Sequence, residues 1–176
     1  MSTRNRRASS RLTVGVMCLT LCLSTVGMIG TAAAVPIVQT NSSWKITPDS
    51  PSGTSWYSNA AFDDSGWQDA TVLYDYGAVV GDPAFNGTKI IWSSGGQFSN
   101  TETQVWIRHP FSLGMLPSSA SLFVGCDDDC TVWVNGNQVI NDTNGFANNT
   151  IVNPLPFLQV GQNLVAYTVS DNFLAF

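Results

Sequence analysis

The feature of this sequence that most constrains its fold is the recurrence of apolar residues at every second position. The alternation is found in residues 105–108, 122–124, 131–134 and 164–169. A period of two is typical of β-strands, whose successive side chains point to opposite faces of a sheet. Stretches rich in Gly, Pro, Asn and Ser separate these segments, and no segment shows convincing helical periodicity. The sequence therefore predicts an all-β fold, an antiparallel β-sandwich or jelly roll.

One turn can be predicted in detail. Asn135-Gly136 is a favoured pair for a two-residue type I′ turn, because that turn requires positive φ at both positions. We predict that it joins the strands Thr131–Val134 and Asn137–Ile140 in a hairpin.

The first 34 residues have the order of a secretory signal peptide. Four arginines precede an apolar run from Leu12 to Ile29, and the small residues Ala32 and Ala34 follow it. Small residues at these two positions suit the signal peptidase, so we expect cleavage after Ala34 and a mature domain from 35 to 176. An uncleaved membrane anchor is the alternative, but glycines and threonines dilute the apolar run, and cleavage is favoured.

Removal of this leader makes the chain strongly acidic. The mature part retains three basic residues against twelve acidic ones, a formal charge of −9. Such a charge repels nucleic acid and anionic membranes, so neither is expected as a partner. Cys126 and Cys130 are then the only cysteines, and we expect them to form a disulfide in an oxidising compartment. Asn-x-Ser/Thr sequences mark four candidate glycosylation sites: Asn41, Asn86, Asn141 and Asn148.

Four segments follow a known pattern in order. They are WYSNAAFDDSGWQDA (56–70), VWIRHPFSL (105–113), CDDDCTVWVNGNQV (126–139) and LPFLQVGQNLVAYTVSDN (155–172). Together they resemble the galactose-binding-domain-like β-sandwiches, the jelly-roll sugar-binding domains appended to β-galactosidase-type glycoside hydrolases. The resemblance covers residues 44–172 and implies that fold, with sugar binding as the accompanying expectation.

The same motifs can be interpreted as folding signals. In FDDSGW, Asp or Ser side chains are expected to accept backbone N–H bonds in a tight turn that lets Phe62 and Trp67 both face the core. Related domains continue past the last motif into a further strand, whereas this sequence stops at Phe176. The alternatives are a minimal domain, a fragment, or a sandwich lacking its final strand, whose open apolar edge would accept a strand from another molecule.

Three consecutive aspartates, Asp127, Asp128 and Asp129, lie between the two cysteines. Their mutual repulsion is relieved either by water or by a bound Ca²⁺ that takes further oxygen ligands from other loops. A solvated turn is favoured, because the spacing does not match an EF-hand loop and adjacent residues of an extended segment cannot all face one ion. A structural calcium ion is the one cofactor suggested; zinc is not expected beside oxidised cysteines and a single histidine.

Catalysis by this chain alone is not expected. His109 is the only histidine and Glu102 the only glutamate, no serine lies in a G-x-S-x-G sequence, and no pair of carboxylates is distinguished by its setting. Arg108, a cation within a strand, is expected to form a structural ion pair with an aspartate.

Aromatic residues beside turns give the best functional candidates, because sugar rings stack on Trp and Tyr while Asn, Asp and Gln bind hydroxyls. We predict a carbohydrate site at Tyr74, Asp75, Tyr76, Trp92 and Gln97, with burial in the core as the favoured alternative for Trp92. Burial is also expected of four tryptophans in the motifs and strands: Trp56, Trp67, Trp106 and Trp133.

The predicted function is that of a secreted, non-catalytic carbohydrate-binding module, whose partners are glycans or other extracellular proteins. The alternative is a structural or adhesive subunit of an extracellular assembly, which would self-assemble through an open sheet edge.

Overall fold

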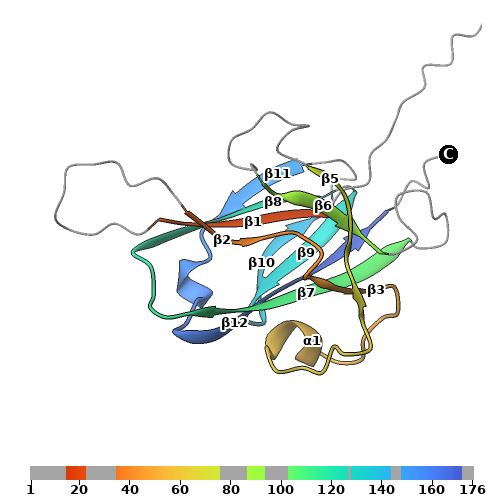
Figure 1. Ribbon diagram of the computed structural model, residues 1–176, viewed down its shortest axis with the longest axis horizontal. Coiled ribbons are helices and arrows are strands. Elements are labelled where there is room, and N and C mark those ends of the chain that lie inside the picture. The colour runs from red at the N-terminus through yellow and green to blue at the C-terminus, as the bar shows by residue number, and fades with distance from the viewer. Residues whose placement is uncertain are drawn as a thin grey trace, which may run out of the picture.

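Two antiparallel sheets stack face to face in the computed structural model, which describes residues 15–22, 35–75, 87–93, 103–126, 128–143 and 148–171 (Figure 1). Sheet A has the strand order β11-β8-β1-β6-β5, with β2 paired to β1. Sheet B has the order β10-β9-β12-β7-β3-β4. The predicted all-β antiparallel sandwich is confirmed.

The described elements are twelve strands and two short helical turns. Sheet A contains β1 (Gly15–Cys22), β2 (Val35–Gln39), β5 (Thr71–Asp75), β6 (Lys89–Trp92), β8 (Ser119–Cys126) and β11 (Asn148–Val152). Sheet B contains β3 (Lys45–Thr47), β4 (Gln68–Asp69), β7 (Gln104–Leu113), β9 (Asp129–Val134), β10 (Asn137–Asp142) and β12 (Gly161–Ser170). The turns are α1 (Ser55–Ser58) and the 3-10 helix η2 (Leu155–Phe157), and no helix among the described residues has the length and apolarity needed to span a membrane.

The core lies between the two sheets and is formed by the alternating positions of the sequence. Each of them is almost completely buried, and together they make one contiguous cluster: Val105, Ile107, Leu122, Val124, Val132, Val134, Val165, Tyr167 and Val169. Burying one such aliphatic side chain stabilises the fold by about 1.5–3 kcal/mol. The period-two pattern therefore identifies both the strands and their inward faces.

The predicted hairpin is confirmed. Asn135 and Gly136 have φ values of +49° and +82°, and they join β9 to β10. Asn and Gly tolerate positive φ better than other residues, which is why the chain turns here.

A second hydrophobic cluster lies on the outer face of sheet B. Leu164 and Ala166 alternate with inward-facing residues of β12, so they point outward, where α1 and the loop after it cover them (Figure 1). Phe62 and Trp67, expected to face the core, both pack against this outer hydrophobic cluster, with ring centroids 6.0 Å apart. Of the four tryptophans expected to be buried, Trp56 is, whereas the others are half-buried against the same cluster: Trp67, Trp106 and Trp133.

The segment predicted to be a leader contributes a strand to sheet A. β1 pairs with β8 over eight positions, from Gly15 opposite Cys126 to Cys22 opposite Ser119. Cleavage after Ala34 stays a prediction, and so does the domain boundary that depends on it.

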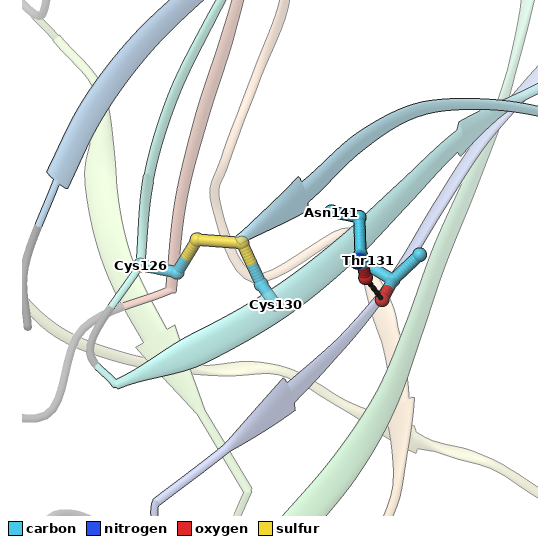
Figure 2. Close-up of a disulfide and its surroundings, with 4 residues drawn as sticks. All are labelled: Cys126, Cys130, Thr131 and Asn141. Atoms are coloured by element: carbon cyan, nitrogen blue, oxygen red, sulfur yellow. Dashed lines mark hydrogen bonds between the residues drawn. A yellow bond between two sulfur atoms is a disulfide. The ribbon is translucent and has the colours of Figure 1, made fainter. Parts of the chain in front are cut away.

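The predicted disulfide joins the two layers. Cys126 is the last residue of β8 in sheet A, and Cys130 lies at the beginning of β9 in sheet B (Figure 2). Their Cα atoms are 6.2 Å apart, across the short corner where the chain passes from one sheet to the other.

Candidate functional site

Three loops meet at one end of sheet B around a pocket of about 740 Å³. The first loop follows α1, the second is the β9–β10 turn, and the third lies between η2 and β12. The residues that line the pocket are Ser58, Asn59, Ala60, Ala61, Asn135, Gln159 and Gln162. Two buried polar side chains, Arg108 and Asn163, determine how these loops are held.

Arg108 fixes the loop after α1 onto sheet B. Its side chain is fully buried; Nε donates to the Trp56 carbonyl at 3.0 Å, and Nη2 donates to the Asn59 carbonyl at 2.9 Å. Nη1 donates to the Phe62 carbonyl at 3.1 Å and forms an ion pair with the Asp64 carboxylate. Burial lowers the pKa of Arg108 and the Asp64 charge opposes that change, so the guanidinium stays a cation. The predicted structural ion pair is confirmed.

The FDDSGW turn contributes a second constraint on the same loop. The Asp63 carboxylate accepts a bond from the Ser65 backbone N–H at 3.1 Å, as predicted for this motif. Hydrogen bonds from Ser65 lower the pKa of the Asp63 carboxyl. The turn therefore positions Asp64 beside Arg108 while Asp63 closes the backbone.

Asn163, on β12, organises the loop before that strand. It is fully buried, and its Nδ2 donates to the carbonyls of Gln159 at 2.7 Å and Gly161 at 2.9 Å. Its Oδ1 accepts bonds from the Gln159 N–H at 2.9 Å and from Asn135 Nδ2 at 2.8 Å. All four bonding positions of the amide are thus used, which holds Gln159 and Gln162 at the pocket wall.

Asn135 connects the hairpin turn to η2 and to β12. Its Nδ2 donates to the Phe157 carbonyl at 2.7 Å, and its Oδ1 accepts the Leu164 N–H at 2.7 Å. The turn also touches α1, because a Cβ at Gly136 would lie 2.8 Å from the Cβ of Ser58, the last residue of that helix. The three walls of the pocket are therefore linked through direct contacts.

Several polar groups of the pocket remain available to a ligand. The exposed amide of Gln162 and the Nδ2 of Asn59 have no hydrogen-bond partner among the described residues, whereas Asn59 Oδ1 accepts the Ala61 N–H at 2.9 Å. Gln159 Nε2 donates to the Gln162 carbonyl at 2.7 Å, which leaves its Oε1 to accept. No lining residue is charged. The pocket presents neutral donors and acceptors suited to hydroxyl groups.

The residues predicted for a carbohydrate site lie elsewhere. Trp92, on β6, is 3% exposed and packs between the sheets, so its alternative role in the core is the one observed. A ring buried in this way cannot stack on a sugar, so the predicted stacking role is wrong for Trp92. Tyr74 and Asp75 belong to β5 of sheet A; their side chains, together with Tyr76 and Gln97, lie outside the described residues, and their role stays a prediction.

The aspartate loop is less solvated than expected. Asp128 is 7% exposed, and its backbone N–H donates to the Ser170 carbonyl at 3.0 Å. The prediction of a solvated aspartate turn is therefore wrong for Asp128. Asp129 is half-buried at the start of β9, and Asp127 lies outside the described residues. In the part of the chain that is described, no group of three His, Cys, Asp or Glu side chains is arranged to hold a metal ion. The calcium site stays a prediction.

Two of the glycosylation candidates have described side chains. Asn41 is exposed and accepts the Ser43 N–H at 2.7 Å, and Asn141 is exposed and accepts from Thr131 Oγ1 at 3.0 Å (Figure 2). Asn86 and the side chain of Asn148 lie outside the described residues. Modification of any of the four stays a prediction.

His109 has a packing role. Its ring stacks on Trp44 with centroids 4.8 Å apart and 18° between the planes. Burial lowers the pKa of His109, and a backbone hydrogen bond with Ser43 partly opposes this shift. The half-buried imidazole therefore packs against the fully buried Trp44 at the edge of the core.

No protein-family model and no curated protein matches this sequence. Its structure is similar to Bacteroides uniformis β-glucuronidase 2 (19% identity, 77% of this chain and 15% of that chain, TM-score 0.51). It is also similar to a Bacteroides uniformis β-glucuronidase (18%, 77% and 14%, 0.50) and to a glycosyl hydrolase family 2 member from Bacteroides cellulosilyticus (18%, 74% and 17%, 0.48). The likeness is one of fold. This chain spans less than a fifth of each of those proteins, and the galactose-binding-like type stays a prediction.

Proposed function

We propose that this chain is a non-catalytic accessory β-sandwich domain of the glycoside-hydrolase type, and that it binds a neutral sugar in the pocket at the end of sheet B. The observation that carries the proposal is the pocket itself. Its volume of about 740 Å³ is within the range of small-ligand sites, and its walls are held by fully bonded Asn163 and Arg108 while other amides remain unpaired.

Charge favours a neutral sugar over a uronic acid. A bound carboxylate would lose water without gaining a counter-charge, because the lining residues carry none. The acidic mature chain would add a repulsive long-range potential. Galactose is the first sugar to test, since the sequence resembles galactose-binding-like domains.

Catalysis at the same site is not part of the proposal. Hydrolysis of a glycoside by the common mechanisms uses two facing carboxyl groups, and the lining residues include neither Asp nor Glu. Hydrogen bonding to hydroxyls is the chemistry that the amides supply.

Calorimetric titration of the full chain with methyl galactoside, methyl glucoside and glucuronic acid tests the proposal. We expect saturable binding of a neutral sugar, and about fivefold weaker binding after Gln162→Ala, the effect of one hydrogen bond of about 1 kcal/mol. Gln138→Ala is the matched control, because Gln138 is exposed on β10 and does not line the pocket. Equal affinities of the two variants, or no saturable binding of any sugar, would contradict the proposal.

We further propose that the chain is exported and carries N-linked glycans. The basic-apolar-small order of residues 1–34, the Cys126–Cys130 disulfide and the exposed Asn41 and Asn141 support this. Mass spectrometry of the product secreted by a glycosylating host tests it. A peptide that begins at Val35 and glycopeptides containing Asn41 or Asn141 are expected; an intact N-terminus or unmodified asparagines would contradict the respective part.

A further inference from the structure

Strand β1 is enclosed on both edges. On one edge it pairs with β8 over eight positions. On the other edge Gly15 lies opposite Ile91 of β6, and Cys18–Leu21 lies opposite residues 35–39 of β2. A strand with partners on both sides is a central strand of sheet A, although it comes from the segment that the sequence marks as a leader.

The neighbour of β1 depends on this pairing. Residues 119–126 of β8 pair with β1 along one edge, while β11 covers only residues 122–126 of the other. The β8 side chains that face the core are among the least exposed in the protein: Ala120, Leu122, Val124 and Cys126. If β1 were absent, eight positions of β8 would lose their ladder partner beside this apolar surface. Unpaired backbone N–H and C=O groups next to a hydrophobic core are costly, so the gap requires an occupant.

We propose that the gap between β8 and the β2–β6 edge is a strand-acceptor slot, and that in the processed chain a strand from another polypeptide fills it. Processing is hydrolysis of the Ala34–Val35 peptide bond by a peptidase: one water is consumed, and the Ala34 carboxylate and the Val35 amine are formed. The leader is then no longer covalently attached to β2, and β1 can be replaced by a strand that takes over its hydrogen bonds.

The chemistry of the slot specifies the occupant. The segments GVMCLTLC (β1), SASLFVGC (β8) and VPIVQ (β2) contain no charged residue. A charged strand would lose water there without a counter-charge. The fitting partner is therefore an uncharged, apolar segment of about eight residues that runs antiparallel to β8, the strand-addition mode of peptide recognition.

A second copy of this chain is a poorer donor. β2, whose only partner is β1, has five residues and is too short to pair with the eight positions of β8. Every other described strand between residues 35 and 170 stays paired within its own sheet when β1 is absent. A copy that donated one of them would lose as many backbone bonds as it gained, so we assign the slot to a foreign strand.

The experiment uses the full chain with a specific protease sequence inserted between Gly27 and Thr31, outside the described strands. After nicking, a fluorescent peptide with the sequence of residues 15–22, Ser replacing both cysteines, is added in excess. We expect native mass spectrometry to show one peptide per chain in place of the leader fragment, with the β8 amides protected from hydrogen exchange. A peptide carrying Lys in place of Leu19, the register partner of the fully buried Leu122, is expected to bind at least tenfold more weakly. The uncut protein is the control and should take up no peptide.

Three results would overturn the proposal. If the leader fragment leaves while the β8 amides stay protected without added peptide, the slot needs no strand. If the fragment cannot be displaced, β1 is a permanent strand of the domain. If the nicked chain doubles in mass, a second copy fills the slot and the assignment to a foreign strand fails.

Discussion

Sheets A and B form the two halves of one core, but they are completed in different ways. All strands of sheet B come from residues 45–170, and its outer face carries a second hydrophobic layer that Arg108 fixes in place. Sheet A has β1 at its centre, between β8 and β6, and β1 belongs to the predicted leader. The strands of sheet B thus all come from the predicted mature domain, whereas sheet A also contains a strand of the segment that is predicted to be cleaved off.

The largest expected effect is at the point that fixes the outer layer on sheet B. Arg108→Met leaves the Asp64 carboxylate and three backbone carbonyls without their donor, and we expect the free energy of unfolding to fall by about 3–5 kcal/mol. Urea denaturation measures it. Lys45→Met is the matched control, because the Lys45–Asp69 pair on the same sheet is largely exposed and should contribute nothing measurable. Equal effects of the two variants would show that the buried pair does not fix this layer.

A matched pair of core substitutions compares the two sheets directly. Ile91 in sheet A and Ile107 in sheet B are both fully buried in the same cluster. Replacing either by Ala should lower the free energy of unfolding by about 2–5 kcal/mol, through lost burial and the cavity left behind. Circular dichroism and tryptophan fluorescence should give coincident transitions for both variants. Separate transitions for Ile91→Ala alone would show that sheet A unfolds independently, which would sharpen the difference between the layers.

An intermediate effect is expected where sheet B touches its outer layer at the pocket. Gly136→Ala forces an L-residue into φ +82° and brings its Cβ to 2.8 Å from Ser58 Cβ, so a loss of about 1–2 kcal/mol from the backbone is expected, with a further loss from the contact. Gly53→Ala, at φ +68° with open space around it, isolates the backbone effect. Thermal unfolding compares them. If Ser58→Gly does not relieve the difference between the variants, the contact is not its cause.

The smallest expected effect concerns the pH dependence of sheet B. Burial lowers the pKa of His109 below its ordinary value of 6.5, so below about pH 6.5 the unfolded chain binds more protons than the folded chain. Stability contributed by the neutral ring is present above pH 6.5 and is lost as the pH falls toward the folded-state pKa. His109→Phe keeps an aromatic ring against Trp44, and it should reduce the pH dependence of the urea denaturation midpoint between pH 7 and pH 5. If the urea midpoint of this variant changes with pH as steeply as that of the unmodified protein, His109 is not the source of the pH dependence.

The parts of the fold that depend on local physics could be predicted from the sequence. Alternation identified the strands and the inward side chains, such as Ile107 and Val165, because strand geometry requires it. Asn135-Gly136 identified the hairpin, because few other pairs accept two positive φ values. The Cys126–Cys130 disulfide was predictable because the leader indicates an oxidising compartment. The ion pair of Arg108 with an aspartate was predictable because a cation within a strand needs an opposite charge.

The pocket could not be predicted in the same way. Its walls come from residues 58–61, 135 and 159–162, which are brought together only by the stacking of α1 and two turns on one sheet. The outer cluster was missed for a related reason: alternation separates the two faces of β12, but it does not say that a second layer covers the outer one. Leu164 and Ala166, apolar on the face opposite Val165, were the available signal. The leader was predicted from its composition, which is equally compatible with an apolar strand.

The position of the disulfide keeps β8 attached to sheet B during any exchange of β1. Cys126 is opposite Gly15, at the end of β8 where the chain crosses between the sheets, and the bond closes a five-residue loop, a restraint of about 2 kcal/mol in the unfolded chain. The disulfide holds the two Cα atoms 6.2 Å apart and so keeps the sheets from separating at this corner. Because the bond joins β8 to β9 and does not involve β1, an exchange of β1 would leave the acceptor strand β8 fixed to sheet B at this end.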